Sequence, residues 1–227
     1  MTAGEVVTGL SYLVGAAVFF WAARRRKLAT EGIAILAGVG FVCGILGAKV
    51  TQALASSSPL LAPGGRALLG GVVFGWLGVL VAKRIMGLRR PTGDLFALAL
   101  PAGEAVGRIG CHLNGCCYGI VCDTPFSVTQ HGAERFPAQL VSSAVAASIF
   151  GFLLWLAPRL RREGDLFRAY LLLFGVTRFG LEFVRWRESV HFGLSSMQWF
   201  CLELIVFASV GLVRRNQYGV SQLRRGV

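Results

Sequence analysis

The sequence has little charge for its length. Only 15% of its 227 residues are charged and 55% are hydrophobic, whereas a soluble domain is typically about 25% charged and about 45–50% apolar. Such a chain lacks the polar side chains that a water-exposed surface requires, and apolar stretches of about 20 residues recur along it. We therefore predict a polytopic membrane protein. A soluble all-helical protein with an unusually apolar core is the alternative.

Apolar runs long enough to cross a bilayer occur seven times. We expect transmembrane helices at residues 6–23, 32–55, 67–82, 95–113, 139–157, 166–184 and 197–213. The predicted fold class is an all-α integral membrane protein, organised as a single domain over residues 1–227. The sequence lacks a recognisable linker, a low-complexity tract or a short-period repeat.

Acidic residues are scarce, with 11 against 23 lysines and arginines, and the net charge is +12. In a soluble protein this surplus would suggest nucleic acid binding. Here most positive residues form clusters on alternate connections and at the C-terminus. All of these clusters therefore lie on the same side of the membrane. That side is the cytoplasmic one, which places the N-terminus outside. Charge thus records topology and contact with anionic lipids, and we expect no nucleic acid partner. The four clusters are Arg24–Lys27, residues 83–90, residues 159–168 and residues 214–225.

The first apolar run also lacks the marks of a cleavable signal peptide. Its positive residues follow the run instead of preceding it, and no small-residue cleavage site stands out. We expect this run to remain as a membrane span.

Seven positive residues stand apart from these clusters, in predicted spans or toward the outer face. Ionisable groups at membrane depth usually face the bundle interior and mark a substrate or a pathway. Arg185 and Arg187 also fit a simpler interpretation, in which they reach the outer headgroups. The seven are Lys49, Arg66, Arg108, Arg135, Arg178, Arg185 and Arg187.

The sixth predicted span ends in "LLLFGVTRFGLEFVRWRE". Arg178, Glu182 and Arg185 are spaced i, i+4, i+7, which predicts one helix face. One interpretation is a structural ion pair between spans. The other is an anion site, since the surplus positive charge suits a phosphate and arginine offers a fork of donors.

The fourth span ends in "LPAGEAVGRIGCHLNG", where Glu104 can orient Arg108 four residues later. Gly103, Gly107 and Gly110 leave one side of this helix bare, so that another backbone or a headgroup can approach. With Lys49 in the second span, three spans carry interior cations. A bound phospholipid headgroup, an anion channel or an anion transporter would each account for them.

Other motifs predict architecture. Gly71, Gly75 and Gly78 are spaced for close helix packing. "RFPAQL" is typical of a helix start at Pro137, and "SSMQ" resembles a capping box from Ser195 to Gln198.

The outer loop lacks a CxxC pair although it holds four of the six cysteines. Structural zinc sites usually contain such pairs, so the spacing disfavours a metal. The predicted topology places the loop outside, where thiols can oxidise, which favours a disulfide of Cys111 or Cys116 with Cys122. A thiol nucleophile is a further alternative. The cysteines and histidines of this region, which could serve as metal ligands, are Cys111, His112, Cys116, Cys117, Cys122 and His131.

These motifs together resemble the bacterial prolipoprotein diacylglyceryl transferases. The segments that carry the resemblance are "GLSYLVGAAVFFWAARRRK", "LGAKVTQAL", "GGRALLGGVVFG", "GRIGCHLNGCCYG", "RFPAQL" and "TRFGLEFVR". The resemblance implies a seven-span enzyme of the bacterial inner membrane that uses no metal or organic cofactor. It also implies transfer of a diacylglyceryl group from phosphatidylglycerol to the lipobox cysteine of an exported pre-lipoprotein, with release of glycerol phosphate.

Roles follow for the matching residues. The resemblance implies that Arg108 binds the lipid phosphate and that Arg178 supports the phosphate or the charge of the leaving group. Glu182 and Arg185 would hold that geometry. Asn114 matches the family signature, and Lys49 stands where an arginine is common, so both are expected to contribute to the phosphatidylglycerol site.

The chain departs from the family pattern at several positions. A histidine usually precedes the paired glycines of the third span, and Leu69 stands there instead. Thr8, Cys111 and Cys116 replace a tyrosine, an asparagine and a glutamate of the family. Without the usual base, His112 is the catalytic candidate nearest Arg108, with Glu104 and His131 as alternatives. A relative that binds anionic phospholipid or a lipoprotein partner without turnover is the second functional interpretation.

Overall fold

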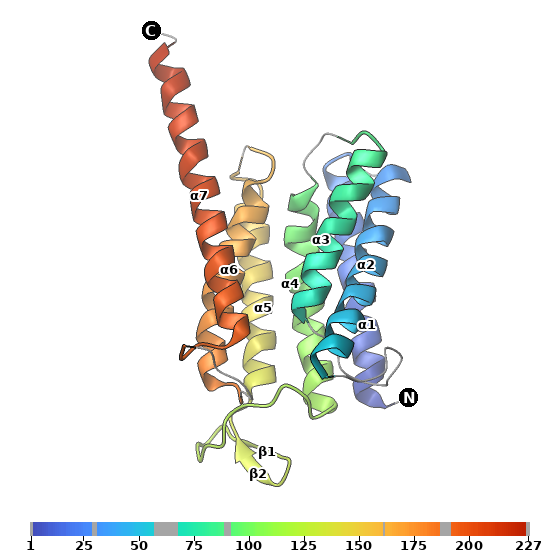
Figure 1. The fold of residues 1–227 in the computed structure, drawn as a ribbon, viewed down its shortest axis with the longest axis vertical. Helices are drawn as coiled ribbons and strands as arrows, with labels where there is room; N and C mark the ends of the chain where they lie inside the picture. Colours follow the sequence, from blue (N-terminus) through green and yellow to red (C-terminus); the bar gives the residue numbers. More distant parts are fainter. Residues whose placement is uncertain are drawn as a thin grey trace. The chain divides into compact units, whose positions relative to one another are not determined.

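The computed structural model describes residues 2–28, 31–56, 68–88, 92–160, 162–186 and 192–225, without the side chains of residues 55–56, 68–69 and 214–225. Within this part the chain is mostly helical (Figure 1). Each predicted span coincides with one helix to within a few residues, the last helix excepted, which continues past residue 213. The helices are α1 (Ala3–Arg25), α2 (Glu31–Ser56), α3 (Leu68–Ile85), α4 (Gly93–Leu113), α5 (Ala138–Leu156), α6 (Asp165–Leu181) and α7 (Ser196–Arg225).

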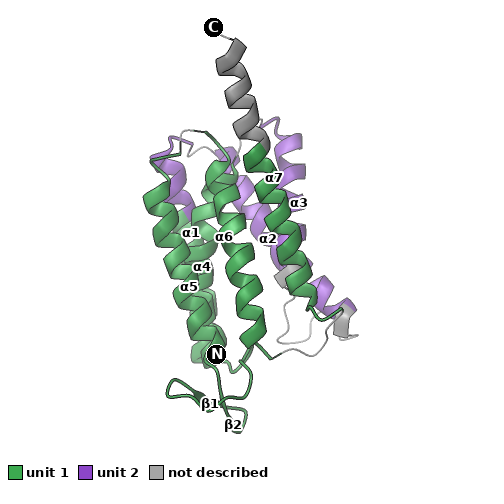
Figure 2. Cartoon of the chain, turned by 90° about the vertical axis from the view of Figure 1, so that its left-hand side faces the viewer, with its two compact units in different colours: residues 1–18, 91–227 green, residues 19–90 purple. Residues whose placement is uncertain are grey.

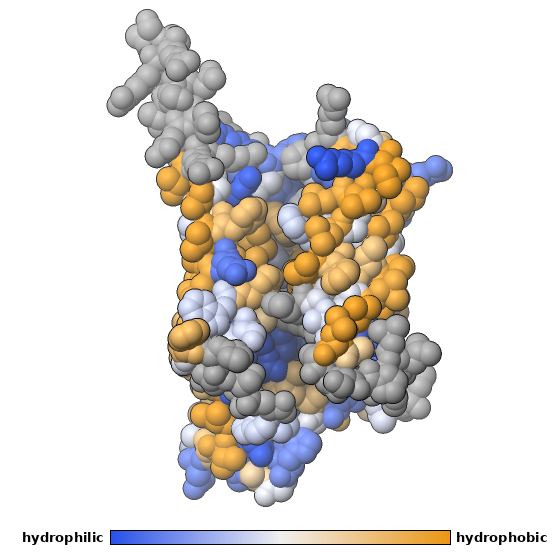
Figure 3. Space-filling view, in the orientation of Figure 1, coloured by the Kyte–Doolittle hydropathy of each residue, from blue (hydrophilic) through white to orange (hydrophobic). Residues whose placement is uncertain are grey.

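The helices carry apolar side chains on their outer flanks. Four stretches of the described chain are long and apolar enough to cross a membrane: α1, most of α2, α5, and Ser196–Val213 of α7. Exposed side chains such as Leu13 and Leu54 lie on them, and hydrophobic side chains form much of the visible helix surface (Figure 3). A membrane protein is therefore supported. Seven crossings and the orientation of the termini stay predictions.

The chain divides into two compact units, drawn in different colours in Figure 2: residues 1–18 with 91–227, and residues 19–90. The expectation of a single domain stays a prediction.

The unit of residues 19–90 is built on a glycine seam between α2 and α3. A side chain added at Gly75 would meet the Gly40 carbonyl oxygen at 3.1 Å, and one at Gly71 would meet the Gly44 oxygen at 3.2 Å. The two backbones approach this closely because no side chain separates them. The predicted packing role of the third-span glycines is confirmed.

In the other unit, α4 packs against the first half of α1 in the same way. A side chain at Gly103 would lie 3.1 Å from the Ser11 carbonyl oxygen, and one at Gly110 would lie 3.1 Å from the Gly4 oxygen. The bare side of α4 therefore receives a neighbouring backbone. Because this side is occupied by α1, other faces of α4 present Glu104 and Arg108.

Buried Asp94 joins α4 to the start of α6. Its two carboxylate oxygens accept hydrogen bonds of 3.0 Å from the backbone N–H groups of Gly164 and Phe167. A carboxylate in this place satisfies amides of the first turn of α6 and complements the positive end of its dipole. Helix α6, which carries Arg178, is thereby fixed against α4.

The all-α prediction is wrong for the loop between α4 and α5, which contains a short antiparallel hairpin, β1 (Val128–Gln130) and β2 (Ala133–Arg135). Its turn, His131–Gly132, has φ values of 53° and 73°. Positive φ at both central residues is typical of the tight turns whose twist matches paired strands. Figure 1 shows this hairpin beyond the end of α4 and the start of α5.

Three residues weighed in the sequence cannot be placed in full. Arg66 and Arg187 lie outside the described residues. Leu69 belongs to α3, but its side chain is also outside the description.

Candidate functional site

An ion pair at the end of α6 is the centre of the site. Arg178 Nη2 lies 2.9 Å from Glu182 Oε2, and Arg185 Nη1 lies 3.9 Å from the same oxygen. The three side chains meet as predicted, but the expected continuous helix face is wrong, because α6 ends at Leu181 and Glu182–Val184 form one 3-10 turn.

The chain leaves the helix because it pairs with the cysteine-bearing loop. Val184 O accepts a hydrogen bond of 3.1 Å from Ile120 N, and Trp186 N donates one of 3.2 Å to Tyr118 O. Arg185 is extended between them, opposite Gly119. The end of α6 and the loop after α4 thus form one backbone unit, which positions the arginines relative to the cysteines.

Ser195 holds Glu182 from the other side. Its hydroxyl donates to Glu182 Oε1 at 3.3 Å and accepts from Gln198 N at 3.2 Å, while Gln198 Oε1 accepts from Ser195 N at 2.9 Å. The predicted capping box is confirmed. The hydroxyl that caps α7 also fixes the carboxylate that faces two arginines.

Arg178 has hydrogen-bond donors that are not used within the described part of the chain. Its side chain is only 6% exposed, yet Nε and Nη1 are buried without a hydrogen-bond partner among the described residues. Its charge interacts with Arg185, Arg108, Glu182 and Glu104. An unpaired buried donor costs about 1–3 kcal/mol, and more when it is charged. This arrangement is explained if a ligand accepts the two hydrogen bonds.

Arg108 is the second buried cation, and Glu104 orients it as predicted. Nε and Nη2 lie 3.1 and 2.8 Å from Glu104 Oε1. Both Arg108 nitrogens thus donate to the same carboxylate oxygen, and the arginine side chain is 10% exposed. Glu104 fixes the guanidinium and leaves its remaining edge for another acceptor.

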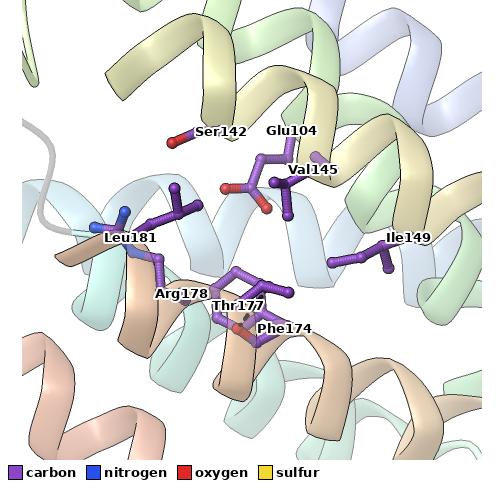
Figure 4. A pocket seen from close by; sticks show the side chains of 9 residues that line it. Glu104, Ser142, Val145, Ile149, Phe174, Thr177, Arg178 and Leu181 are labelled. Atoms are coloured by element: carbon purple, nitrogen blue, oxygen red, sulfur yellow. Dashed lines mark hydrogen bonds between the residues drawn. The ribbon is translucent and has the colours of Figure 1, made fainter. Parts of the chain in front are cut away.

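Helices α4, α5 and α6 enclose a cavity beside these charges (Figure 4). Glu104, Ser142, Thr177 and Arg178 supply its polar groups, and the Glu104 carboxylate points into it. The enclosed volume is about 10 Å³, room for about one water molecule. An anion the size of a phosphate must displace side chains to enter. The apolar lining is Val145, Ala146, Ile149, Phe174 and Leu181.

Three cysteines gather next to the arginines. The Sγ atoms of Cys111, Cys116 and Cys117 all lie within 4.8 Å of one another, and all are free thiols. Hydrogen bonds from the Cys111 and Cys116 thiols lower the pKa of the Cys117 thiol, against the effect of its partial burial, and the charges of Arg185 and Arg108 lower it further.

The disulfide predicted for the outer loop is not formed. All six cysteines are free in the structure, and Cys122 stands apart from the other three, with Sγ 3.7 Å from Ser127 Oγ. The hairpin explains this, since Cys122 N bonds to Glu134 O at 3.1 Å and is held at the strand pair.

His112 is engaged by the loop. Gln130 Nε2 lies 3.1 Å from His112 Nδ1 and donates a hydrogen bond of 3.2 Å to the His112 carbonyl oxygen. Because a carbonyl oxygen only accepts, the NH₂ end of the Gln130 amide faces His112. Gln139 Nε2 donates to Gln130 Oε1 at 3.0 Å, which fixes the same orientation of the Gln130 amide. Nδ1 of His112 is therefore an acceptor that is already used, and Nε2 carries the proton. This tautomer does not suit a general base.

Two other candidates have partners in the framework of their own unit, and a third belongs to the other unit. Asn114 is exposed at the end of α4, and its Oδ1 accepts from Thr2 Oγ1 at 3.2 Å, so it ties α4 to the start of α1. Lys49 lies half-buried on α2 in the other unit. His131 Nε2 lies 2.6 Å from Gly115 O, which makes it part of the loop framework.

The sequence interpretation missed Gln130 and Gln139. Gln139 is 1% exposed and donates to Cys116 O at 2.9 Å, so it holds the cysteine loop onto α5. A glutamine two residues after a helix-starting proline in an apolar span was the available signal, because an amide buried in such a place needs a specific partner.

The chain is mostly helical, has apolar helices long enough to cross a membrane, and buries ionisable side chains, with Glu104 and Arg178 at one cavity. These features define a class of membrane protein whose interior holds charged groups. The class agrees with the comparison to known sequences. The prolipoprotein diacylglyceryl transferase profile matches residues 6–214, and the chain belongs to this family.

Similar proteins extend along most of the chain. The phosphatidylglycerol–prolipoprotein diacylglyceryl transferase of Dehalococcoides mccartyi strain 195 is 27% identical over 217 residues, covering 87% of this chain and 83% of the relative. The protein of the same name from Idiomarina loihiensis is 28% identical and covers 92% and 88%. The one from Polynucleobacter necessarius is 33% identical over 153 residues, which cover 61% of this chain and 58% of the relative.

Proposed function

We propose that this chain transfers the diacylglyceryl group of phosphatidylglycerol to a cysteine thiol of a prolipoprotein and releases glycerol phosphate. The observation that carries the assignment to this site is Arg178, whose nitrogens Nε and Nη1 are buried without an acceptor in the described part of the chain. The names of the relatives supply the two substrates.

The charges of the site suit a phosphodiester. Arg108, Arg178 and Arg185 face Glu104 and Glu182, so the five groups leave one positive charge uncompensated. A phosphodiester carries one negative charge. Its oxygens can accept the free donors of Arg178, which would remove the cost of leaving them unpaired.

The reaction increases the negative charge at the same place. The acceptor sulfur attacks the glycerol carbon that carries the phosphate, and the carbon–oxygen bond breaks with its electrons passing to the departing glycerol phosphate. Fixed cations aimed at the developing charge favour the transition state over the bound substrate. Arg178 is the group we assign to that charge, with Arg108 on the phosphate and Glu182 and Arg185 as positioning residues.

The proposed setting is the bacterial inner membrane, crossed seven times, with the N-terminus outside and the cysteine loop at the outer face. The positive clusters support this orientation. An exported pre-lipoprotein that presents a lipobox cysteine would then meet the site from outside. Contacts of Lys49 and Asn114 with the lipid belong to the same proposal.

Purified chain in proteoliposomes with labelled phosphatidylglycerol and a lipobox peptide tests the function. We expect label on the peptide cysteine and release of glycerol phosphate, and no label on a peptide with serine in its place. Cys122→Ser should label the peptide like the unaltered chain, because Cys122 lies outside the arginine site. Lipid binding without transfer would instead support a non-catalytic relative.

A further inference from the structure

The cluster of Cys111, Cys116 and Cys117 has a use that the arginine site leaves open. A thiol must lose its proton before it attacks carbon, and His112, the base nearest Arg108 in sequence, has its Nδ1 engaged by Gln130. The sequence spacing argued against a metal because no CxxC is present, but spacing says nothing of how the loop folds.

The loop after α4 brings the adjacent residues Cys116 and Cys117 back to Cys111, so that three sulfurs lie close together. Cys111 is in the last turn of α4, and Cys116 N returns to Cys111 O at 3.1 Å. Gly115 and Cys117 have φ values of 64° and 60°. A cysteine is rarely held in the left-handed region, and such positions persist where the surroundings determine them, often at functional sites.

The dimensions are close to those of a metal site. With Zn–S bonds of about 2.3 Å, tetrahedral ligands lie about 3.8 Å apart, so three sulfurs within 4.8 Å need to close by about 1 Å at most. In the described part of the chain the group has three members, with no fourth histidine, cysteine or carboxylate. Three protein ligands with one open position are typical of catalytic zinc, whereas structural zinc has four.

The arginines near the cluster favour its thiolate form. Three thiolates and one Zn²⁺ carry a net charge of −1, and the cluster interacts with the positive charges of Arg108 and Arg185. Cys116 is exposed, while Cys111 and Cys117 are half-buried, so one side of the cluster is open to an incoming ligand.

We propose that Cys111, Cys116 and Cys117 bind a zinc ion whose open position takes the acceptor thiol of the prolipoprotein. This inference rests on the proposed function. As the acceptor sulfur binds the metal, its proton passes to water, since a coordinated thiol is deprotonated. The resulting thiolate attacks the glycerol carbon of the lipid held by the arginines, and the electron pair of the broken carbon–oxygen bond leaves with glycerol phosphate. Zinc replaces the missing base and is not consumed.

Metal content tests the site without reference to activity. Full-length chain purified without chelator should contain about one zinc ion per chain, as should Cys122→Ser, the matched control from the same loop. Cys117→Ser and Cys111→Ala should each retain less than about a tenth of it after dialysis. Cys111→Ala leaves the left-handed residue Cys117 unchanged. Loss of metal in both variants therefore cannot be explained by misfolding at Cys117 alone. No metal in the unaltered chain, or equal metal in all four proteins, overturns the proposal.

Cobalt tests the open position. With Co²⁺ in place of zinc, a lipobox peptide should shift the d–d and thiolate charge-transfer absorption, and a peptide with serine for cysteine should leave both unchanged. An identical spectrum with the two peptides overturns the role in acceptor binding.

Activity separates the two proposals. Chelator-stripped chain should lose about 100-fold or more of its transfer rate and regain it with one equivalent of zinc. Full transfer by the metal-free chain would overturn the zinc proposal and leave the proposed function standing. Bound zinc and a cobalt shift without any labelled peptide would overturn the proposed function and leave the metal site standing.

Discussion

Two groups of helices in the chain, α2 with α3 and α4 with α5 and α6, use apolar helices in opposite ways. Along the α2–α3 seam, glycine lets two backbones meet, as where Gly71 faces the Gly44 carbonyl oxygen. Between α4, α5 and α6 the helices enclose charge, with Arg178 and Glu104 at a cavity. Close packing without side chains stabilises a helix pair at little cost, whereas buried ions cost several kcal/mol each. The difference indicates that the first region is architectural and the second is kept for chemistry.

The largest effect should come from the charged region. Arg108→Ala removes the guanidinium that Glu104 orients and should lower the rate of diacylglyceryl transfer about 10²–10³-fold, because a fixed donor to the phosphate is lost. Peptide labelling in proteoliposomes measures it. Retained turnover in Arg108→Ala would overturn its assignment to the phosphate.

Gly47→Ala should break the glycine seam. The added methyl group would collide with the Phe74 side chain and stand 2.7 Å from the Gly70 carbonyl oxygen, so we expect a loss of about 1–3 kcal/mol in the free energy of unfolding. Thermal unfolding in detergent measures it, with Gly38→Ala as the matched control on α2, where nothing lies within 4 Å. Equal stability of the two variants would contradict the packing role of the seam.

The smallest effect should come from Ser195→Ala, which removes a cap and the hydroxyl on Glu182. We expect a loss of about 1 kcal/mol of stability and a several-fold lower transfer rate, because Glu182 positions Arg178 less well. Ser196→Ala, next to it on the exposed side, is the control. A variant that loses stability but keeps the full rate would show that the hydroxyl only caps α7.

The sequence predicted most of the helical architecture because apolar length and glycine spacing act locally. The capping box at Ser195 was also readable, since both partners lie within one turn. The end of α6 at Leu181 could not be predicted from the sequence, because it depends on backbone pairing with residues 118–120. The hairpin after α4 was hidden because its strands have three residues each. The cysteine cluster needed a left-handed turn that no spacing rule predicts.

The lesson extends to the site. Arg178, Glu182 and Arg185 were found from their spacing, although the backbone that unites them is not a continuous helix. Gln130 and Gln139 were missed because their partners are backbone and amide groups of the loop, which acquire positions only when the chain folds.

The central claim is that Arg178, whose Nε and Nη1 have no acceptor among the described residues, binds and stabilises the anion of the transfer site, and its substitution tests this most directly. Transfer of labelled diacylglyceryl to a lipobox peptide should fall about 10³-fold in Arg178→Ala and be partly retained in Arg178→Lys. It should be nearly unchanged in Arg168→Ala, a matched arginine on α6 that is paired with Asp165 and 26% exposed. An Arg178→Ala protein that folds and transfers at the rate of Arg168→Ala would contradict the account.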